Sequence, residues 1–529
     1  MVRALSITVL LLLVGLPLLA ALPALQWPSA MTLAPWLKAL MQTLLVTLLS
    51  TLVVTWLSLS AARTLATSRW FSALSVLLAT PHVAFAVGVM FLFSPSGYLV
   101  RVIDALSGWL PVPANGWPLP EKSLLTLTVV LVLKELPFLL LMIATQRKQL
   151  PLQRWLLQAQ SLGWSATRAW WWLIVPELLQ RLKLPLAAII IYTVSVVDIP
   201  LLLGPNAPGL LAVVAFEQHY QWADTEAAAI GVWLLILAGA VLLLAATVTV
   251  NGYQRLADRA RQGLVKTTAS RWRRLLAGGG RLITPTLVIV SLLVVLALLL
   301  HSLAGSWFYP ALLPQQWQPQ RWLTEWPYLA PLLWDTFWLA LLTGLLSVAA
   351  AVAVLEHQRQ RGQRQLNVVP LLLLLLPQLV LVLGWQRLLG QGSEGPLLLW
   401  AHVAFGFPYA YLVLHGAWVN LSQRWLYQAQ SLGYSYRRAW FTLVPGMMRG
   451  PLLTAFAIAF SVSIAQYLPT LWLAGGTVPT LTTEAVSIAS GGDWRLASLY
   501  ALMQALLPLL VLSLVMFMQT RQRGTDVSY

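Results

Sequence analysis

The sequence has no cysteine and few charged residues. None of its 529 residues is cysteine, and only 9% are Asp, Glu, Lys or Arg. Without cysteine the chain cannot form disulfides, thiolate metal sites or cysteine nucleophiles. Soluble domains contain about 25% charged residues, so this composition excludes an ordinary soluble globular fold.

Motifs for catalysis are also missing. A phosphate-binding loop needs the pattern G-x-x-x-x-G-K-[ST], and no Gly-Lys pair occurs in the chain. There is no acidic cluster and no nucleophile motif, so we expect neither an enzyme nor a cofactor or metal site here. The histidines are scattered rather than grouped like metal ligands. We assign them to helix interfaces or lipid headgroups: His82, His219, His301, His357, His402 and His415.

Long hydrophobic runs are abundant, and 59% of the residues are hydrophobic. Apolar runs of about 20 residues predict transmembrane helices. We therefore predict an all-α polytopic membrane protein with about 12 transmembrane helices, six in each half of the chain. The predicted spans are 4–25, 37–61, 70–94, 123–144, 184–204, 227–250, 282–303, 331–355, 366–389, 397–418, 452–473 and 496–518. We expect the first run to be an uncleaved helix and not a signal peptide.

The net charge of +17 follows the predicted topology. With the N-terminus in the cytoplasm, about 26 of the 33 Lys and Arg residues fall in cytoplasmic segments, as the positive-inside rule requires. The charge therefore indicates the topology of the chain in a membrane and not a nucleic-acid partner. Both termini are predicted to be cytoplasmic.

The two halves are related by recurring residues. Pro137 corresponds to Pro408, and the outer starts of the second and eighth spans share the pattern MQT/WDT at 41–43 and 334–336. Because each half has an even number of helices, these are parallel six-helix repeats, and transporters place their substrate path between such repeats. The predicted segments are a first helix with its outer segment (1–36), a first core (37–251), a basic linker (252–281), a further helix with its outer segment (282–330), a second core (331–519) and a tail (520–529).

One short stretch occurs twice almost unchanged. Residues 153–165 read QRWLLQAQSLGWS and residues 423–435 read QRWLYQAQSLGYS, identical at eleven of thirteen positions. A glycine at the end of a short helix can adopt the left-handed conformation, and the following serine can cap a second helix. Each copy therefore predicts a helix–turn–helix on the cytoplasmic side, ending near Pro176 or Pro445.

A lipid surface demands amphipathicity but no particular side chains. Two copies of one protein partner, docking on the two halves, would keep both loops alike. The predicted docking residues are Gln158, Ala159, Gln160, Ser161, Leu162, Gly163 and Pro176 in the first copy, and Gln428, Ala429, Gln430, Ser431, Leu432, Gly433 and Pro445 in the second.

These loops resemble the cytoplasmic EAA loops of binding-protein-dependent ABC importer permeases. LQAQSLG at 157–163 and YQAQSLG at 427–433 align with that motif, followed by LIVP and TLVP. The chain looks most like the fused, two-half permeases of the ferric-iron and thiamine type. It departs from the family where Leu157 and Tyr427 replace the glutamate. The Gly-to-Pro spacing is also one residue shorter in the second copy.

The resemblance implies the type I permease fold of ABC importers and several partners. Two copies of a cytoplasmic ATPase subunit would dock on 151–176 and 421–445 and would carry ATP and Mg²⁺. A periplasmic solute-binding protein would deliver a small solute, which the family likeness suggests is thiamine-like or ferric.

Charged and polar residues inside predicted spans are candidates for a substrate path, because burying them in lipid is costly. Lys134 and Glu135 are adjacent in the fourth span, whereas Asp198 and Gln466 occupy equivalent positions in the fifth and eleventh. Satisfied structural groups are the alternative interpretation. Two alternative functions also remain open: a secondary transporter with two six-helix halves, or a membrane scaffold that transports nothing.

Overall fold

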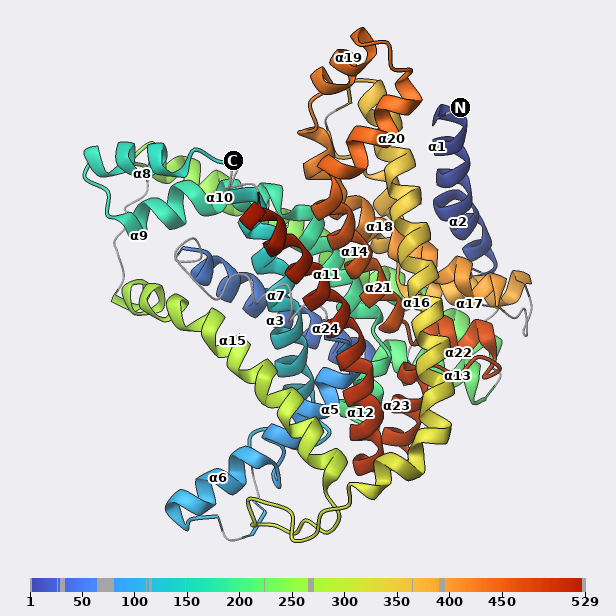
Figure 1. Cartoon of the computed structure of the whole chain (residues 1–529). Helices are drawn as coiled ribbons and strands as arrows, with labels where there is room; N and C mark the ends of the chain where they lie inside the picture. The colour runs from blue at the N-terminus through green and yellow to red at the C-terminus, as the bar shows by residue number, and fades with distance from the viewer. Residues whose placement is uncertain are drawn as a thin grey trace.

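Helices build nearly all of the chain, as the computed structural model shows (Figure 1). The structure describes residues 2–525 except 26, 29–33, 64–79, 111, 114–116, 148, 223, 265–270, 364 and 390–394. Within these residues there is no strand, only an isolated bridge between Ala304 and Trp317. The prediction of an all-α polytopic protein is therefore confirmed.

The first half contains α1 (Val2–Leu10), the π-helix η1 (Leu11–Gly15), α2 (Leu16–Ala21), η2 (Leu22–Leu25), η3 (Ala34–Trp36), α3 (Leu37–Ala62), α5 (His82–Phe93), α6 (Tyr98–Ser107), α7 (Leu124–Arg147), α8 (Leu152–Ser161), α9 (Ala166–Ala169), the π-helix η5 (Trp170–Ile174), α10 (Val175–Arg181), α11 (Lys183–Ser195), α12 (Asp198–Leu203), α13 (Leu211–Tyr220) and α14 (Thr225–Arg261). The second half contains α15 (Arg271–Leu303), α16 (Gln320–Gln360), η6 (Val369–Leu375), α17 (Gln378–Leu389), α18 (Pro396–Val419), α19 (Arg424–Ser431), α20 (Tyr436–Met447), α21 (Arg449–Ile464), α22 (Leu468–Ala474), α23 (Leu481–Ser490) and α24 (Trp494–Thr525).

Nine helices in the described residues are long and apolar enough to cross a membrane, or up to eleven if two bent pairs each count as one span. The sequence predicts about twelve spans, and the structure interrupts three of them. The predicted span 184–204 is two short helices, α11 and α12, and 366–389 bends by 99° between η6 and α17. The span 452–473 divides into α21 and α22. Residues 70–79 of the predicted third span lie outside the described residues.

Prolines account for these breaks. A proline inside a helix has no backbone N–H to donate in a hydrogen bond, and its ring clashes with the carbonyl four residues earlier. Pro200 and Pro469 lie four residues after Val196 and Ala465, where α11 and α21 have just ended. Pro377 lies directly at the bend between η6 and α17.

Thr43 and Thr336, which the MQT and WDT patterns pair, each accept a hydrogen bond from the start of a helix; we call this bond the tether. The Leu211 N–H, at the start of α13, donates to the Thr43 hydroxyl at 2.8 Å. The Leu481 N–H, at the start of α23, donates to the Thr336 hydroxyl at 3.0 Å. The first N–H groups of a helix have no partner within the helix, so each threonine satisfies one of them inside the protein.

The first helix of each half packs against the other half. Helix α1 lies against α16, and α2 lies against α17, where the Trp385 indole donates to the Pro17 carbonyl at 2.9 Å. Helix α15 packs against α3 and α5, and a Cβ added to Gly88 would lie 2.6 Å from Val294. Glycine thus permits a close crossing that a larger residue would block.

Three buried clusters show where the halves are joined. A large cluster combines side chains of both halves, from α5, α12 and α13 to α17, α22, α23 and α24. A second cluster lies around α7, α10 and the end of α3 of the first half, and it includes Leu287 and Val288 of α15. A third contains α18, α20 and the end of α16, with η1. The halves therefore share one core at the end where α12 and α23 lie and have separate cores towards α8 and α19 (Figure 1).

We expect Thr336→Val to lower the stability of the protein, because it leaves the buried Leu481 N–H without a partner. Such a loss costs about 1–3 kcal/mol. Thermal unfolding of the purified protein in detergent measures the change. Thr324→Val is the control, since the exposed Thr324 hydroxyl only bonds the carbonyl of Arg321 in its own helix. Equal melting temperatures for the two variants would contradict this role of the tether.

Candidate functional site

The two copies of the repeated stretch lie at one end of the molecule (Figure 1). The first repeated loop (151–176) contains α8, α9 and η5, and the second repeated loop (421–445) contains α19 and most of α20. The start of α1 and the end of α24 lie at this same end (Figure 1). All four features therefore mark one side of the molecule.

The turn that ends each short helix has the same hydrogen bonds in both copies. Gly163 and Gly433 have φ of 75° and 87°, a left-handed conformation that other residues adopt at a cost. The Trp164 N–H donates to the Ala159 carbonyl at 2.9 Å, and the Tyr434 N–H donates to the Ala429 carbonyl at 3.1 Å. This Schellman-type ending fixes the direction of the next helix.

The next helix is capped and braced alike in both copies. The Ser165 hydroxyl accepts from the Arg168 N–H at 3.2 Å, and the Ser435 hydroxyl accepts from the Arg438 N–H at 3.4 Å. The same arginines stack on the aromatic ring after the glycine: Arg168 lies 4.2 Å from the Trp164 ring centre, and Arg438 lies 5.1 Å from that of Tyr434. Position 164/434 therefore varies between Trp and Tyr but keeps its ring.

Most of the identical side chains point outward. The Gln, Ser and Leu residues that end α8 and α19 are exposed in both loops, and Leu162 and Leu432 each keep 77% of their surface accessible. Leu157 and Tyr427 are also exposed. Packing inside this chain therefore does not explain why these residues are identical.

A π-helix absorbs the extra residue of the first copy. A π-helical turn inserts one residue into an α-helix, and η5 occupies the stretch where the first copy is one residue longer. The carbonyls that this turn displaces are bonded from α14: Tyr253 donates to Trp171 O, and Arg261 donates to Trp172 O at 3.2 Å. The second copy continues as one α-helix.

The two prolines at the ends of the repeated loops have different positions. Pro176 lies in the first turn of α10, at the expected boundary. Pro445 lies inside the last turn of α20, two residues before that helix ends. Helix α20 runs on to Met447, and the chain bends by 71° between α20 and α21.

Each repeated loop is bonded to the end of a long helix of its own half, but with different chemistry. In the first half, Arg63 at the end of α3 donates to the Thr167 hydroxyl at 2.8 Å, and the Trp170 indole donates to the Leu59 carbonyl at 3.1 Å. These bonds fix α9 and η5 to α3.

In the second half, a buried ion pair holds the loop. Arg359 and Glu356 lie near the end of α16 and are 9% and 4% exposed, and two of their N–O distances are 2.6 and 2.9 Å. The Tyr436 hydroxyl, at the start of α20, donates to Glu356 and accepts from Arg359 at 2.9 Å. A bidentate pair of this kind is geometrically demanding, so it fixes α20 to α16.

Lys134 and Glu135 are buried, and both contact the segment that starts α5. The Lys134 ammonium donates to the Thr80 carbonyl, and Glu135 Oε1 lies 3.7 Å from His82 Nε2. The two residues therefore tie α7 to the start of α5.

Asp198 and Gln466 lie at the two proline-associated breaks. Asp198 begins α12 and interacts electrostatically with His82, the first residue of α5. Gln466 accepts from the amide of Gln378, the first residue of α17, at 2.7 Å. Both are buried. The structure thus places ionisable side chains in the first half where the second half has a pair of neutral amides.

His82 and Gln378 were missed as site residues in the sequence, although Pro81-His82 and Pro377-Gln378 form a recognisable repeat. His402 was assigned to an interface and is 1% exposed. Its ring bonds the Ser463 hydroxyl at 2.8 Å and the Thr470 hydroxyl at 3.0 Å, bridging the break between α21 and α22.

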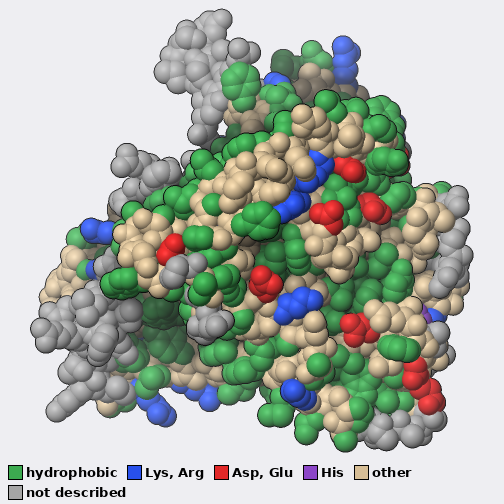
Figure 2. All heavy atoms as spheres, turned by 90° about the horizontal axis from the view of Figure 1, so that it is seen from below, with side chains coloured by type: hydrophobic (Ala, Val, Ile, Leu, Met, Phe, Trp, Pro, Cys, Tyr) green, Lys and Arg blue, Asp and Glu red, His purple; other side chains and the backbone are tan. Residues whose placement is uncertain are grey.

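The opposite end of the molecule differs in charge. Acidic and basic side chains are interspersed there on a largely hydrophobic face (Figure 2). Asp104 lies in α6 and Glu121 in the segment before α7, whereas Glu325 lies near the start of α16 and Asp493 precedes α24. The end with the repeated loops is instead predominantly basic.

These features define a polytopic membrane transport subunit, in which repeated halves bury a polar layer and share a duplicated loop at one end. The chain is 31% identical over 451 residues to the inner membrane ABC transporter permease protein YnjC of Escherichia coli (strain K12), covering 83% of this chain and 78% of that protein. The chain therefore belongs to the inner membrane ABC transporter permeases. No protein-family model and no solved structure matches it.

We expect Tyr436→Phe to loosen the second repeated loop, because it removes the hydroxyl between Glu356 and Arg359. Hydrogen bonds to charged groups contribute about 1.5–3 kcal/mol. Amide hydrogen exchange over 424–447 should accelerate, and exchange over 152–181 should not change. Tyr434→Phe is the matched control, since only the ring of Tyr434 contacts Arg438. The role of Tyr436 is refuted if both variants exchange like the unmodified protein.

Proposed function

We propose that the chain is the permease subunit of an ATP-driven importer, with two copies of a cytoplasmic ATP-binding subunit docking on the two repeated loops. One observation carries the proposal: the two loops share hydrogen bonds, caps and outward-facing side chains, although their attachment to the rest of the protein differs. If one partner must recognise both loops, we expect the loops to share an exposed surface even where their attachments to the rest of the protein differ.

The contact we propose is less charged than in the family that these loops resemble. Leu157 and Tyr427 stand where that family has glutamate, and both are more than half exposed. Leu162 and Leu432 add a second exposed apolar side chain to each loop. These exposed apolar side chains, surrounded by Gln and Ser, form a small surface on each loop. Burying them against a partner would supply most of the binding energy, because buried side chains dominate the energy of an interface.

The arrangement of cores supports alternating access. The halves share one core at the end away from the repeated loops and have separate cores near them. ATP binding would draw the two loops together, and each loop would carry its half with it through the bonds to α3 or α16. Closing one end and opening the other then needs only different affinities of the ATPase for the two states.

The polar layer at the helix breaks is the substrate path that we propose. Asp198, His82 and Glu135 lie on one side and Gln466 and Gln378 on the other. Leu131 belongs to the shared core and Leu136 to the first half's own core, so Glu135 lies where the two cores meet. Polar groups at such a boundary can contact a solute that crosses between them.

Orientation follows from charge. The basic end with the repeated loops and both termini would face the cytoplasm. The opposite end (Figure 2) would face the periplasm, where a solute-binding protein delivers a small solute. Hydrolysis of ATP belongs to the partner subunit, because this chain lacks a phosphate-binding loop.

We expect the Leu162→Asp, Leu432→Asp double variant to lose the ATPase subunit encoded with this chain. Each substitution would bury a charge in the docked complex without touching this chain's own core. Co-purification in detergent measures retention of the ATPase. Leu106→Asp is the matched control, because Leu106 is 84% exposed at the opposite end. Unchanged retention in the double variant would refute docking at these loops.

A further inference from the structure

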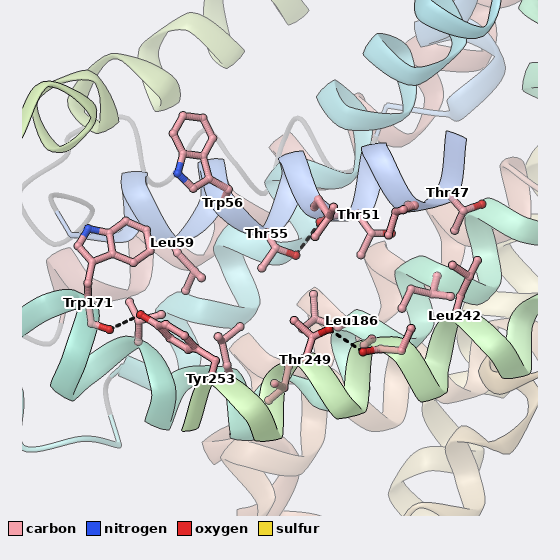
Figure 3. Close-up of a pocket in the computed structure, with 18 residues that line it drawn as sticks. Thr47, Thr51, Thr55, Trp56, Leu59, Trp171, Leu186, Leu242, Thr249 and Tyr253 are labelled. Carbon is pink, nitrogen blue, oxygen red and sulfur yellow. Dashed lines mark hydrogen bonds between the residues drawn. The ribbon is translucent and has the colours of Figure 1, made fainter. Parts of the chain in front are cut away.

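A groove of about 520 Å³ runs along the first half between α3, α11 and α14 (Figure 3). Its walls are largely apolar, and two lining hydroxyls bond within their own helices: Thr55 donates to Thr51 O at 2.7 Å, and Thr249 donates to Ala245 O at 2.7 Å. Leu52 and Ala245 at its rim are exposed. In a membrane-spanning chain such a rim faces lipid.

One stripe of α3 leads along the groove towards the repeated loops. Thr47, Thr51, Thr55 and Leu59 recur every four residues and line it (Figure 3), and Arg63 is the next position on this face. From Thr47 to Leu59 the stripe rises about 18 Å, at 1.5 Å per residue. That is close to one leaflet of a hydrocarbon core about 30 Å thick.

Two arginines meet beyond the loop-side end of the groove. Helix α15 approaches α3 so closely that a Cβ on Gly280 would lie 2.4 Å from the Ser60 carbonyl oxygen. This contact brings Arg281 near Arg63. Burial, and then the charge of Arg281, lower the pKa of Arg63. Among the described residues, neither guanidinium forms an ion pair with a carboxylate.

In the described part of the second half, the positions that correspond to this arrangement hold different side chains. Counting from the paired threonines Thr43 and Thr336, Thr51 corresponds to Gly344 and Arg63 to Glu356. Phe456 of α21 lies against Gly344, within 2.8 Å of an added Cβ, whereas α11 has Ala188 at the corresponding position. An aromatic ring thus occupies the place of the groove, and a residue of an internal ion pair occupies the place of Arg63.

We propose that this groove binds an anionic phospholipid from the leaflet nearest the repeated loops, with one acyl chain along α3 and the phosphate between Arg63 and Arg281. The apolar groove supplies area for the chain, and two adjacent cations without a carboxylate supply the charge that a phosphate complements. Arg63 also bonds Thr167, so the bound lipid braces the first repeated loop. The second loop is held instead by Glu356, which occupies the position that corresponds to Arg63.

Native mass spectrometry of the detergent-purified chain tests the site with dioleoylphosphatidylglycerol and dioleoylphosphatidylcholine as probes. The unmodified chain should retain the anionic lipid preferentially. The Arg63→Gln, Arg281→Gln pair should weaken that retention about tenfold or more, and the Arg63→Lys, Arg281→Lys pair should keep it. Arg449→Gln, which removes an exposed arginine from the loop end of the second half, should change nothing.

Filling the groove tests the acyl chain separately. Thr51→Phe or Ala246→Phe should reduce retention of both lipids. Two different positions are tested in case one of the variants does not fold. Hydrogen exchange over 152–181 should slow with the anionic lipid, while 424–447 serves as internal control. The proposal is overturned if the glutamine pair retains its preference, if the filled grooves bind lipid normally, or if excess inorganic phosphate displaces the lipid, which would indicate a site for free phosphate.

Discussion

Hydrogen bonds between each repeated loop and the end of a long helix hold the loop to its own half. Arg63 and Leu59 bind the first loop through Thr167 and Trp170, whereas Glu356 and Arg359 bind the second through Tyr436. Because these bonds leave the loops little freedom, a force applied at a loop moves the whole half. In the proposed importer, the separate cores near the loops and the shared core at the other end would determine where the molecule opens.

The halves have the same plan but different chemistry. The π-helix η5, the electrostatic interaction between Asp198 and His82, and the apolar groove along α3 belong to the first half. The second half has a continuous α20, the neutral Gln466–Gln378 pair and Phe456. A single chain permits this divergence, since each half needs to fit only the other. On the outward face of the repeated loops most residues are identical, with Leu157 and Tyr427 as an exception.

Several elements could be predicted from sequence for physical reasons. Long apolar runs identified most spans, and the Gly-Ser pattern identified both loop turns, since each depends on local preferences alone. The breaks at Pro200 and Pro469 were missed, because an apolar run hides an interruption that only the proline signals. The crossings of α15 on α5 at Gly88 and of α2 on α17 at Gly384, where an added Cβ would lie 2.4 Å from Ala21, depend on long-range packing that the sequence does not reveal. His82 and Gln378 were missed because their partners, Asp198 and Gln466, are distant in sequence.

The central claim is that the two repeated loops move together when the ATPase binds ATP. The chain has no native cysteine, so spin labels at Arg154→Cys and Arg424→Cys, exposed equivalent positions at the start of the two loops, report one distance. We would measure it by pulsed electron resonance in the complex with the ATPase, without nucleotide and with ATP trapped. The account predicts a shorter distance with ATP. An unchanged or longer distance in a complex that still hydrolyses ATP would contradict it.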